Sequence, residues 1–531
     1  MNINSSTQFS ETTNRLKSLL FQFDEIHSEE KIILLHQLNY FLPTKLQEWK
    51  QTHQLLMTMM AYPDNKMMLD LVQTTLSNLL KRLEKKTSLT ASLSGTGFLH
   101  TAIECNFSFV KVNYLIKTFP RQMSIHSASS SIDTQKLVLK LVLPNVEYSK
   151  IYLGEKDLKS RISEFNTSTK LTDLEWLVQI IQQSSLDKKT QAFVYQQLGI
   201  FIQWKISNKN DSMSFLRGAS LPTYFHTKPI DRKNNLQQII HQALPLPETE
   251  PFSNANEDDI TLFNLGKGIS IALFGSTVDK RYSLESYIGY LVLKNNIPAS
   301  YGGGWLFGER CQFGINILEP FRGGESGLII CELLRVYHQY FGANRFLVKP
   351  YQFGLHNTEA LKTGAFWFYY KLGFRPEDST LKELAYKEEQ AKQQNTSYKS
   401  DLSTLKKYTK SNLALTLSST SYPNYDSELL SQKITTYINT HFDGNRTMAL
   451  NQCFKALTVG LTISLKDWKK EDIEYAKEVS LLFCLSPDAK NWIKKHQKNI
   501  TLFIQLKSAK TELPWIKHLQ RFDAFWEMIK V

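Results

Sequence analysis

The hydrophobic pattern divides the chain into a helical first part, a central segment of strands and a helical last part. In residues 10–86, apolar side chains recur at helical spacing in four stretches joined by short polar turns. A small-residue break follows at 87–98. We therefore predict an all-helical N-terminal region over residues 1–245. Its further helices are expected at residues 107–119, 134–143, 173–183 and 191–205.

The pattern weakens between residues 208 and 259, where prolines recur among serine, asparagine and acidic residues. Such a composition is typical of an irregular approach or a linker. We place the boundary of the next domain within residues 245–258.

Short apolar runs rich in β-branched and aromatic residues predict strands in the central segment. The strands are expected at residues 269–274, 287–294, 297–307, 312–318 and 346–348. A helix is expected at 326–341, and a second helix ends at Gly373, a residue type that commonly stops helices. Three consecutive glycines, 302–304, interrupt the third strand. Glycine there indicates a bulge, or a ligand or neighbouring backbone at close approach.

The last part of the chain is polar at first and then helical again. Residues 381–412 are rich in lysine, glutamate, glutamine and serine, and predict a solvated helix that leads into a flexible linker. The C-terminal region, 413–531, should be helical. Its helices could cover the core, recruit a partner or form a separate bundle. They are expected at residues 427–437, 447–459, 470–482, 487–502 and 515–529.

Composition, charge and cysteine spacing argue against several classes of function. The chain has 531 residues, of which 42% are hydrophobic, and a formal net charge of +13. Its lysines are scattered, so no nucleic-acid or membrane surface is evident. The five cysteines form no CxxC pair, which argues against a disulfide framework and a structural zinc site, and we expect no metal. No apolar run is long enough for a membrane span, and no secretion signal opens the chain, so we expect a soluble, cytoplasmic protein.

The strongest candidate for chemistry is the turn that follows the strand at 312–318. A buried strand, a glycine-rich turn with an arginine and a helix together make a phosphate cradle. Backbone N–H groups at a helix start are unpaired, and the helix dipole favours an anion there. The candidate ligand-binding residues are Arg322, Gly323, Gly324, Glu325, Ser326, Gly327 and Leu328.

The order of these elements resembles the GNAT superfamily of N-acetyltransferases. The order is a hairpin, a strand, an arginine turn, a helix, a strand, and then a helix that ends in Tyr-Tyr-Lys-Leu-Gly-Phe at 369–374. The resemblance covers about residues 260–378 and assigns 246–380 to a GNAT-like domain. It implies a mixed sheet whose fourth and fifth strands splay apart to hold acyl-CoA, which is acetyl-CoA or a longer thioester.

The resemblance also implies roles for individual residues. Arg322 and the backbone of 323–328 would hold the pyrophosphate, and Tyr369 would protonate the departing thiolate. A phenol, with a pKa of about 10, suits that task. The acceptor would be an amine on a small molecule or a protein, attacking the thioester directly. The candidate bases for its proton are Glu319, His356 and Glu309.

Several polar residues leave alternatives open. Glu325 stands where the family turn has glycine, and a carboxylate there would repel a pyrophosphate. Lys362 stands where the last helix usually has asparagine, and Asn357 comes too early to replace it. The alternatives are therefore a catalytically degenerate GNAT-like scaffold that binds a ligand or protein, and a donor carried on an acyl-carrier protein. Asn316 and Gln352 could orient substrate or satisfy backbone groups.

Overall fold

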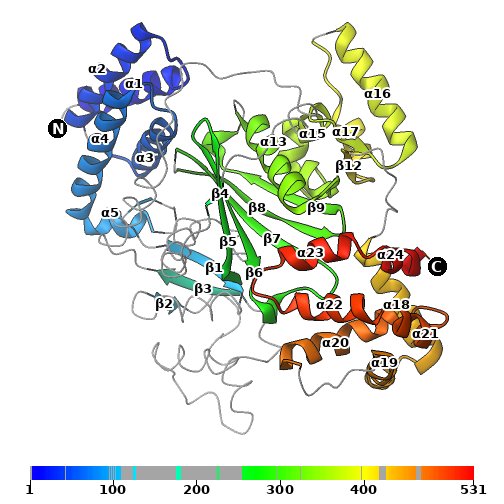
Figure 1. Ribbon diagram of the computed structural model, residues 1–531. Coiled ribbons are helices and arrows are strands. Elements are labelled where there is room, and N and C mark those ends of the chain that lie inside the picture. The colour runs from blue at the N-terminus through cyan, green and yellow to red at the C-terminus, as the bar shows by residue number, and fades with distance from the viewer. Residues whose placement is uncertain are drawn as a thin grey trace, which may run out of the picture.

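The computed structural model confirms the α+β class, with helical regions at both ends of the chain and a central mixed sheet (Figure 1). The residues that the structure describes are 3–41, 43–94, 96, 98, 99, 101, 103–108, 123–126, 175–180, 224–225, 254–295, 297–322, 325–395, 397–417, 426–461 and 468–530.

The N-terminal region begins with the four predicted helices. Asp24 and Asn65 cap the second and fourth, because their side chains accept the backbone N–H groups of the first helical turn. A buried ion pair, Lys31 Nζ to Asp64 Oδ2 at 2.8 Å, joins the second helix to the turn before the fourth. A short fifth helix occupies part of the expected break. The helices are α1 (Ile3–Leu19), α2 (Glu25–Tyr40), α3 (Leu46–Ala61), α4 (Lys66–Glu84) and α5 (Thr87–Ser92).

The prediction that residues 1–245 are all-helical is wrong. Strands β1 (Ile103–Ser108), β2 (Met123–His126) and β3 (Glu175–Ile180) form an antiparallel sheet in the order β1-β3-β2. The third lies within the helix expected at 173–183, because a short apolar run does not distinguish a strand from a buried helix. The helices expected at 134–143 and 191–205 lie outside the described residues.

The central sheet has nine strands among the described residues, in the order β11-β12-β10-β9-β8-β7-β6-β5-β4. Neighbouring strands are antiparallel except β9 and β10, which run parallel. All five strands predicted in this segment are present, and the long strand β5 was not predicted. The strands are β4 (Tyr224–Phe225), β5 (Ala255–Gly266), β6 (Ile269–Ser276), β7 (Ser286–Lys294), β8 (Ile297–Phe307), β9 (Arg310–Ile317), β10 (Arg345–Val348), β11 (Arg375–Pro376) and β12 (Leu413–Thr416).

The glycines of β8 make room for tyrosine rings. A Cβ on Gly303 would lie 2.2 Å from the Tyr287 hydroxyl, and a Cβ on Gly304 would lie 2.6 Å from Cε1 of Tyr337. The Tyr337 hydroxyl donates to the carbonyl oxygen of Ile288 at 2.6 Å. The close approach that the glycine run indicates is therefore made by side chains of the protein's own core.

Helices follow the parallel strands, as predicted. Helix α13 (Ser326–Val336) follows β9 and ends in a π turn, Tyr337–Phe341. The helix predicted to end at Gly373 is divided into α14 (Thr358–Thr363) and α15 (Ala365–Lys371), because Gly364 between them has a left-handed backbone conformation (φ 69°).

Residues 381–412 are part of the folded unit rather than a flexible linker. Helix α16 (Ser379–Gln394) is followed by α17 (Leu402–Tyr408), and β12 then inserts between β10 and β11. The ring of Tyr408 stacks on Phe366 of α15, with centroids 3.8 Å apart and the planes within 5°. The sheet is therefore completed by a strand from beyond the expected linker.

The C-terminal region is helical, as predicted, and packs on the core. Phe307 of β8 contacts Trp526, with ring centroids 5.1 Å apart, and one apolar cluster includes side chains of both regions. Of the three expected roles, these helices fulfil that of covering the core. They are α18 (Ser427–Phe442), α19 (Arg446–Leu461), α20 (Lys470–Phe483), α21 (Ala489–Lys495), α22 (Gln497–Lys507), α23 (Leu513–Gln520) and α24 (Asp523–Lys530).

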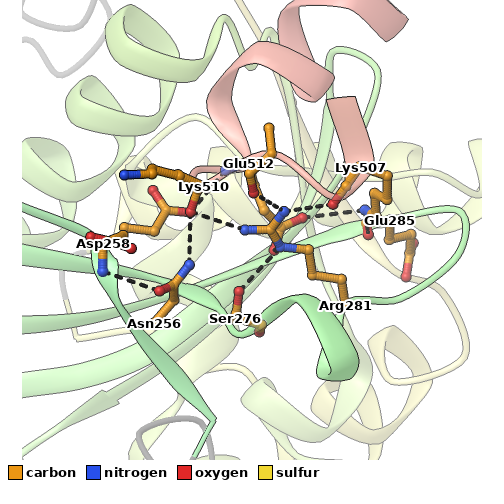
Figure 2. A network of polar contacts seen from close by, with 10 residues as sticks. Asn256, Asp258, Ser276, Arg281, Glu285, Lys507, Lys510 and Glu512 are labelled. Atoms are coloured by element: carbon orange, nitrogen blue, oxygen red, sulfur yellow. Dashed lines mark hydrogen bonds and ion pairs between the residues drawn. The ribbon is translucent and has the colours of Figure 1, made fainter. Parts of the chain in front are cut away.

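A buried polar network fastens this region to the sheet (Figure 2). Arg281 donates to the backbone oxygens of Lys507 at 2.5 Å and Ala509 at 2.7 Å. Its Nε lies 3.7 Å from Glu512, whose other oxygen lies 3.2 Å from Lys507 Nζ. Lys507 also donates to the backbone oxygen of Glu285 at 2.8 Å. A buried charge is tolerated only when it is paired in this way.

Candidate functional site at the divergence of two parallel strands

The candidate site lies where β9 and β10 separate. The two strands pair only from Arg310 to Gln312, opposite Arg345 to Leu347. After Val348 the chain turns into a short helix, η6 (Pro350–Phe353), so that the last part of β9 faces an opening. There the Ile315 N–H donates to the side chain of Gln352 at 3.3 Å instead of to a neighbouring strand.

A cavity of about 530 Å³ occupies this opening. The end of β9 forms one wall, the start of α13 and η6 form others, and α14 and α15 complete it. Its volume is within the usual range for a small-molecule site. The lining residues are Ile315, Asn316, Ile317, Arg322, Ser326, Ile330, Tyr351, Gln352, Asn357, Glu359, Ala360, Thr363, Ala365, Phe368 and Tyr369.

Arg322 lies at the mouth of the cavity. Its Nε donates to the backbone oxygen of Ile317 at 3.0 Å, which directs the guanidinium across the opening. One guanidinium nitrogen lies 2.5 Å from Glu359 Oε1, on the first turn of α14. Both side chains are about half exposed or more, at 49% and 70%. The Arg322 cation is thus accessible to an anionic ligand, which would compete with the Glu359 carboxylate for it.

Glu325 is turned away from the cavity. Its carboxylate is buried, with 3% of the side chain exposed, and lies 2.8 Å from Nζ of Lys294 at the end of β7. The expected conflict between Glu325 and an anionic ligand is therefore absent, because the carboxylate neither lines the cavity nor lacks a counter-ion. Gly323 and Gly324 lie outside the described residues.

The remaining residues of the predicted turn differ in their placement. Ser326, the first residue of α13, lines the cavity, whereas Gly327 and Leu328 do not. A Cβ added to Gly327 would meet nothing within 4 Å, so packing does not require glycine there.

Tyr369 is one of the residues that line the cavity. Its side chain is buried, and its hydroxyl lies 3.4 Å from Oε1 of Gln352, the group that also accepts the Ile315 N–H. Burial raises the pKa of Tyr369 above its ordinary value, because the phenolate would lose its hydration. The hydroxyl is therefore protonated at neutral pH and has a proton to donate.

The three candidate bases do not line the cavity. Glu319 is exposed before Pro320, and His356 is exposed in a left-handed turn (φ 54°). Glu309 precedes β9, and its carboxylate accepts the Asn344 side-chain amide at 2.7 Å. At about 3.3 Å per residue, the length of β9 separates Glu309 from the cavity by about 20 Å.

Polar groups flagged in the sequence do reach the cavity. Asn316 donates to the Tyr301 hydroxyl at 2.5 Å, and Gln352 bridges β9 and α15. Asn357 caps α14 by accepting the Ala360 N–H at 3.0 Å. Glu359 was not predicted. Its only signal was its place in a first helical turn beside a capping asparagine, which alone does not identify a site.

Among the described residues, no group of three or more histidine, cysteine or acidic side chains could hold a metal ion. In the same part of the chain, no helix has the length and apolar character needed to cross a membrane. No protein-family model, curated protein or solved structure matches this chain. The function must therefore be argued from the site.

Proposed function

We propose that this protein is an N-acyltransferase that moves an acyl group from acyl-CoA to an amine by direct attack. One observation carries the proposal: a cavity opens between two diverging parallel strands, and both Arg322 and Tyr369 line it. The first turn of α13 also faces this cavity through Ser326. A cation and a helix start suit phosphate groups, and a buried phenol suits a departing thiolate.

The sheet supports the proposal. The GNAT resemblance implies a mixed sheet whose fourth and fifth strands splay apart, and β9 and β10 pair over three residues before they separate. They are the fourth and fifth of the strands that the sequence predicts in the segment that carries the resemblance, and the structure adds β5 before them. The burial of Glu325 against Lys294 removes the strongest chemical objection to an anionic donor at this turn.

In the proposed reaction, the amine nitrogen attacks the thioester carbonyl carbon. A C–N bond forms, the C–S bond breaks, and the thiolate takes the proton of Tyr369. Burial makes a thiolate more basic as well as the phenol, so the two remain matched in a desolvated cavity. Gln352 would hold the phenol in place, since its amide oxygen lies near the hydroxyl. The amine proton leaves to water or to a base outside the cavity, and the Tyr369 phenolate takes a proton back from water after the products leave.

Binding of acyl-CoA and turnover test the proposal separately. Calorimetry with acetyl-CoA and longer acyl-CoAs should detect binding, and no heat at millimolar ligand would refute the CoA donor. Release of free thiol, followed with a panel of primary amines, should depend on Tyr369. Tyr369→Phe should lower turnover about 100-fold or more with little change in affinity, as expected for a general acid.

Tyr370→Phe is the matched control, because the neighbouring Tyr370 hydroxyl donates to Glu389 at 2.9 Å and does not line the cavity. Equal turnover by the Tyr369→Phe and Tyr370→Phe variants would show that Tyr369 is not the general acid. Phosphopantetheine on an acyl-carrier protein, with one phosphate instead of two, is a second donor to include. Stronger turnover with it would favour a carrier-protein partner.

A second candidate function is a binding scaffold without turnover. It is favoured by the absence of Glu319, His356 and Glu309 from the cavity lining. Such a scaffold would bind an acyl-CoA or a related phosphorylated ligand at the same cavity. Tight binding with no thiol release across the amine panel, in wild type and Tyr369→Phe alike, would support this candidate over the transferase.

A further inference from the structure

The corner at the end of α3 contacts the central sheet beside the candidate site. The Asn295 side chain, in the β7–β8 turn, donates to the backbone oxygen of Ala61 at 2.8 Å. The ring of Tyr62 lies 6.0 Å from that of Phe321, the residue before Arg322. This corner of the N-terminal region is therefore held against the segment that leads to the cavity mouth.

Tyr62 also meets the buried ion pair. Nζ of Lys294 lies 5.1 Å from the centre of the Tyr62 ring and 2.8 Å from the Glu325 carboxylate. It donates as well to the backbone oxygen of Lys267, at 2.7 Å. Burial, followed by the charge of Glu325 and a hydrogen bond to it, raises the pKa of Tyr62. The phenol is thus protonated and lies beside the carboxylate.

The carboxylate that Tyr62 and Lys294 hold belongs to Glu325, the residue immediately before α13. The Glu325 backbone oxygen accepts the Ile329 N–H at 2.9 Å, which is the first hydrogen bond of the helix. Ser326, next in the chain, lines the cavity, and so does Arg322. Fixing the Glu325 side chain therefore fixes the direction in which this helix start faces the cavity.

We infer that Tyr62 and Lys294 are positioning residues for the donor site, so that the N-terminal helical region is a working part of the acyltransferase unit. They act through Glu325, whose carboxylate they hold away from the cavity and whose charge Lys294 neutralises. The inference rests on the proposed function, because it concerns binding of the same acyl-CoA donor.

Lys294→Met in the full chain tests the inference by calorimetry with acetyl-CoA. It leaves Glu325 as an uncompensated buried charge, which disturbs the start of α13 whether the carboxylate moves toward water or takes up a proton. Acetyl-CoA should then bind about tenfold more weakly or worse. In Lys294→Met/Glu325→Gln the charge is gone, and affinity should return to within about threefold of wild type. Tyr62→Phe should weaken binding about threefold, the loss expected for one hydrogen bond.

Lys507→Met is the matched control. It also removes the lysine of a buried lysine–glutamate pair, because Lys507 is paired with Glu512. The two pairs are buried to the same degree: the side chains of Lys507 and Glu512 are 4% and 0% exposed, and those of Lys294 and Glu325 are 1% and 3% exposed. This control should lower the Tm and leave acetyl-CoA affinity unchanged. Amide exchange of Ser326–Ile330 gives a readout without ligand: Lys294→Met should speed it, and the double variant should restore it.

The outcomes separate the inference from the function. Tight binding by wild type and by Lys294→Met alike would overturn the inference and leave the proposed function standing. No recovery of affinity in the double variant would also overturn it, since the effect would then be a general loss of packing. If the wild type binds no acyl-CoA, the proposed function fails and the donor-site role fails with it.

Discussion

Gly304→Ala should destabilise the protein, because the added methyl group would overlap two core side chains. The Cβ would lie 2.6 Å from Cε1 of Tyr337 and 2.7 Å from Sγ of Cys311, whereas carbon contacts are relaxed at about 3.5–4.0 Å. Both neighbours have 0% exposure, so neither can move into solvent. Each would have to shift by about 1 Å within a packed core.

The cost follows from three contributions. Overpacking costs about 1–3 kcal/mol. Displacing the Tyr337 ring would weaken its hydrogen bond to the backbone oxygen of Ile288, worth about 0.5–1.5 kcal/mol. Replacing glycine by alanine returns about 0.4–1 kcal/mol by restricting the unfolded chain. The net loss should be about 0.5–4 kcal/mol, seen as a lower urea midpoint and a lower Tm.

Gly314→Ala is the control on the neighbouring strand. Gly314 pairs with Gly303 across β8 and β9, but a Cβ there would meet its nearest atoms at 3.8 Å, an ordinary contact. This variant should be neutral or slightly more stable than wild type. A Tm for Gly304→Ala at or above that of Gly314→Ala would refute the interpretation that these glycines accommodate core rings.

Two further predictions concern charged groups. Glu359→Gln should tighten acyl-CoA binding about two- to fivefold, because the exposed ion pair with Glu359, worth about 0.4–1 kcal/mol, competes with the donor phosphate for Arg322. Calorimetry at rising salt concentration should show that this gain in affinity shrinks. An unchanged affinity would mean that Arg322 does not contact the donor. Burial lowers the pKa of Lys507 to about 8, so between pH 8 and 10.5 the folded chain binds fewer protons than the unfolded chain. The stability of wild type relative to Lys507→Met should therefore rise with pH in that window, by up to about 3 kcal/mol, and a difference in urea midpoints that is constant with pH would contradict it.

Much of the central segment could be predicted because its signals are local. The hairpin of β7 and β8, strand β9 and helix α13 each show a strong pattern within a dozen residues, and their order placed Arg322 and Tyr369 at one site. Both line the cavity.

Strand β12 could not be predicted because it has only four residues, Leu413–Thr416, after a long polar stretch. Its partners, β10 and β11, lie well before it in the chain. Nothing local indicates that such a strand joins a distant sheet. The expected linker was wrong for the same reason, since Tyr408 of that stretch is held by its contact with Phe366.

The candidate bases show that the sequence does not determine which side chains face the cavity. Glu319, His356 and Glu309 are ionisable residues near predicted strand ends, but proximity in sequence says little about which way a side chain points. Gln352, whose amide joins β9 to Tyr369, is not ionisable, and its sequence context is compatible with two roles. A site that depends on splayed strands needs a group to satisfy the freed backbone, and that requirement appears only in three dimensions.

Glu325 shows how a charge that is unfavourable beside a phosphate site can be compensated by residues far away in the chain. Judged from the sequence alone, a carboxylate in this turn would repel a phosphate group. In the fold it lies 2.8 Å from Lys294, under Tyr62 from another region of the chain. Breaking such a buried pair costs about 3–5 kcal/mol, so Glu325 and Lys294 can change only together. A chain with this glutamate and no lysine at the end of β7 should therefore be unable to hold its helix start against the cavity, whatever the rest of its motif reads.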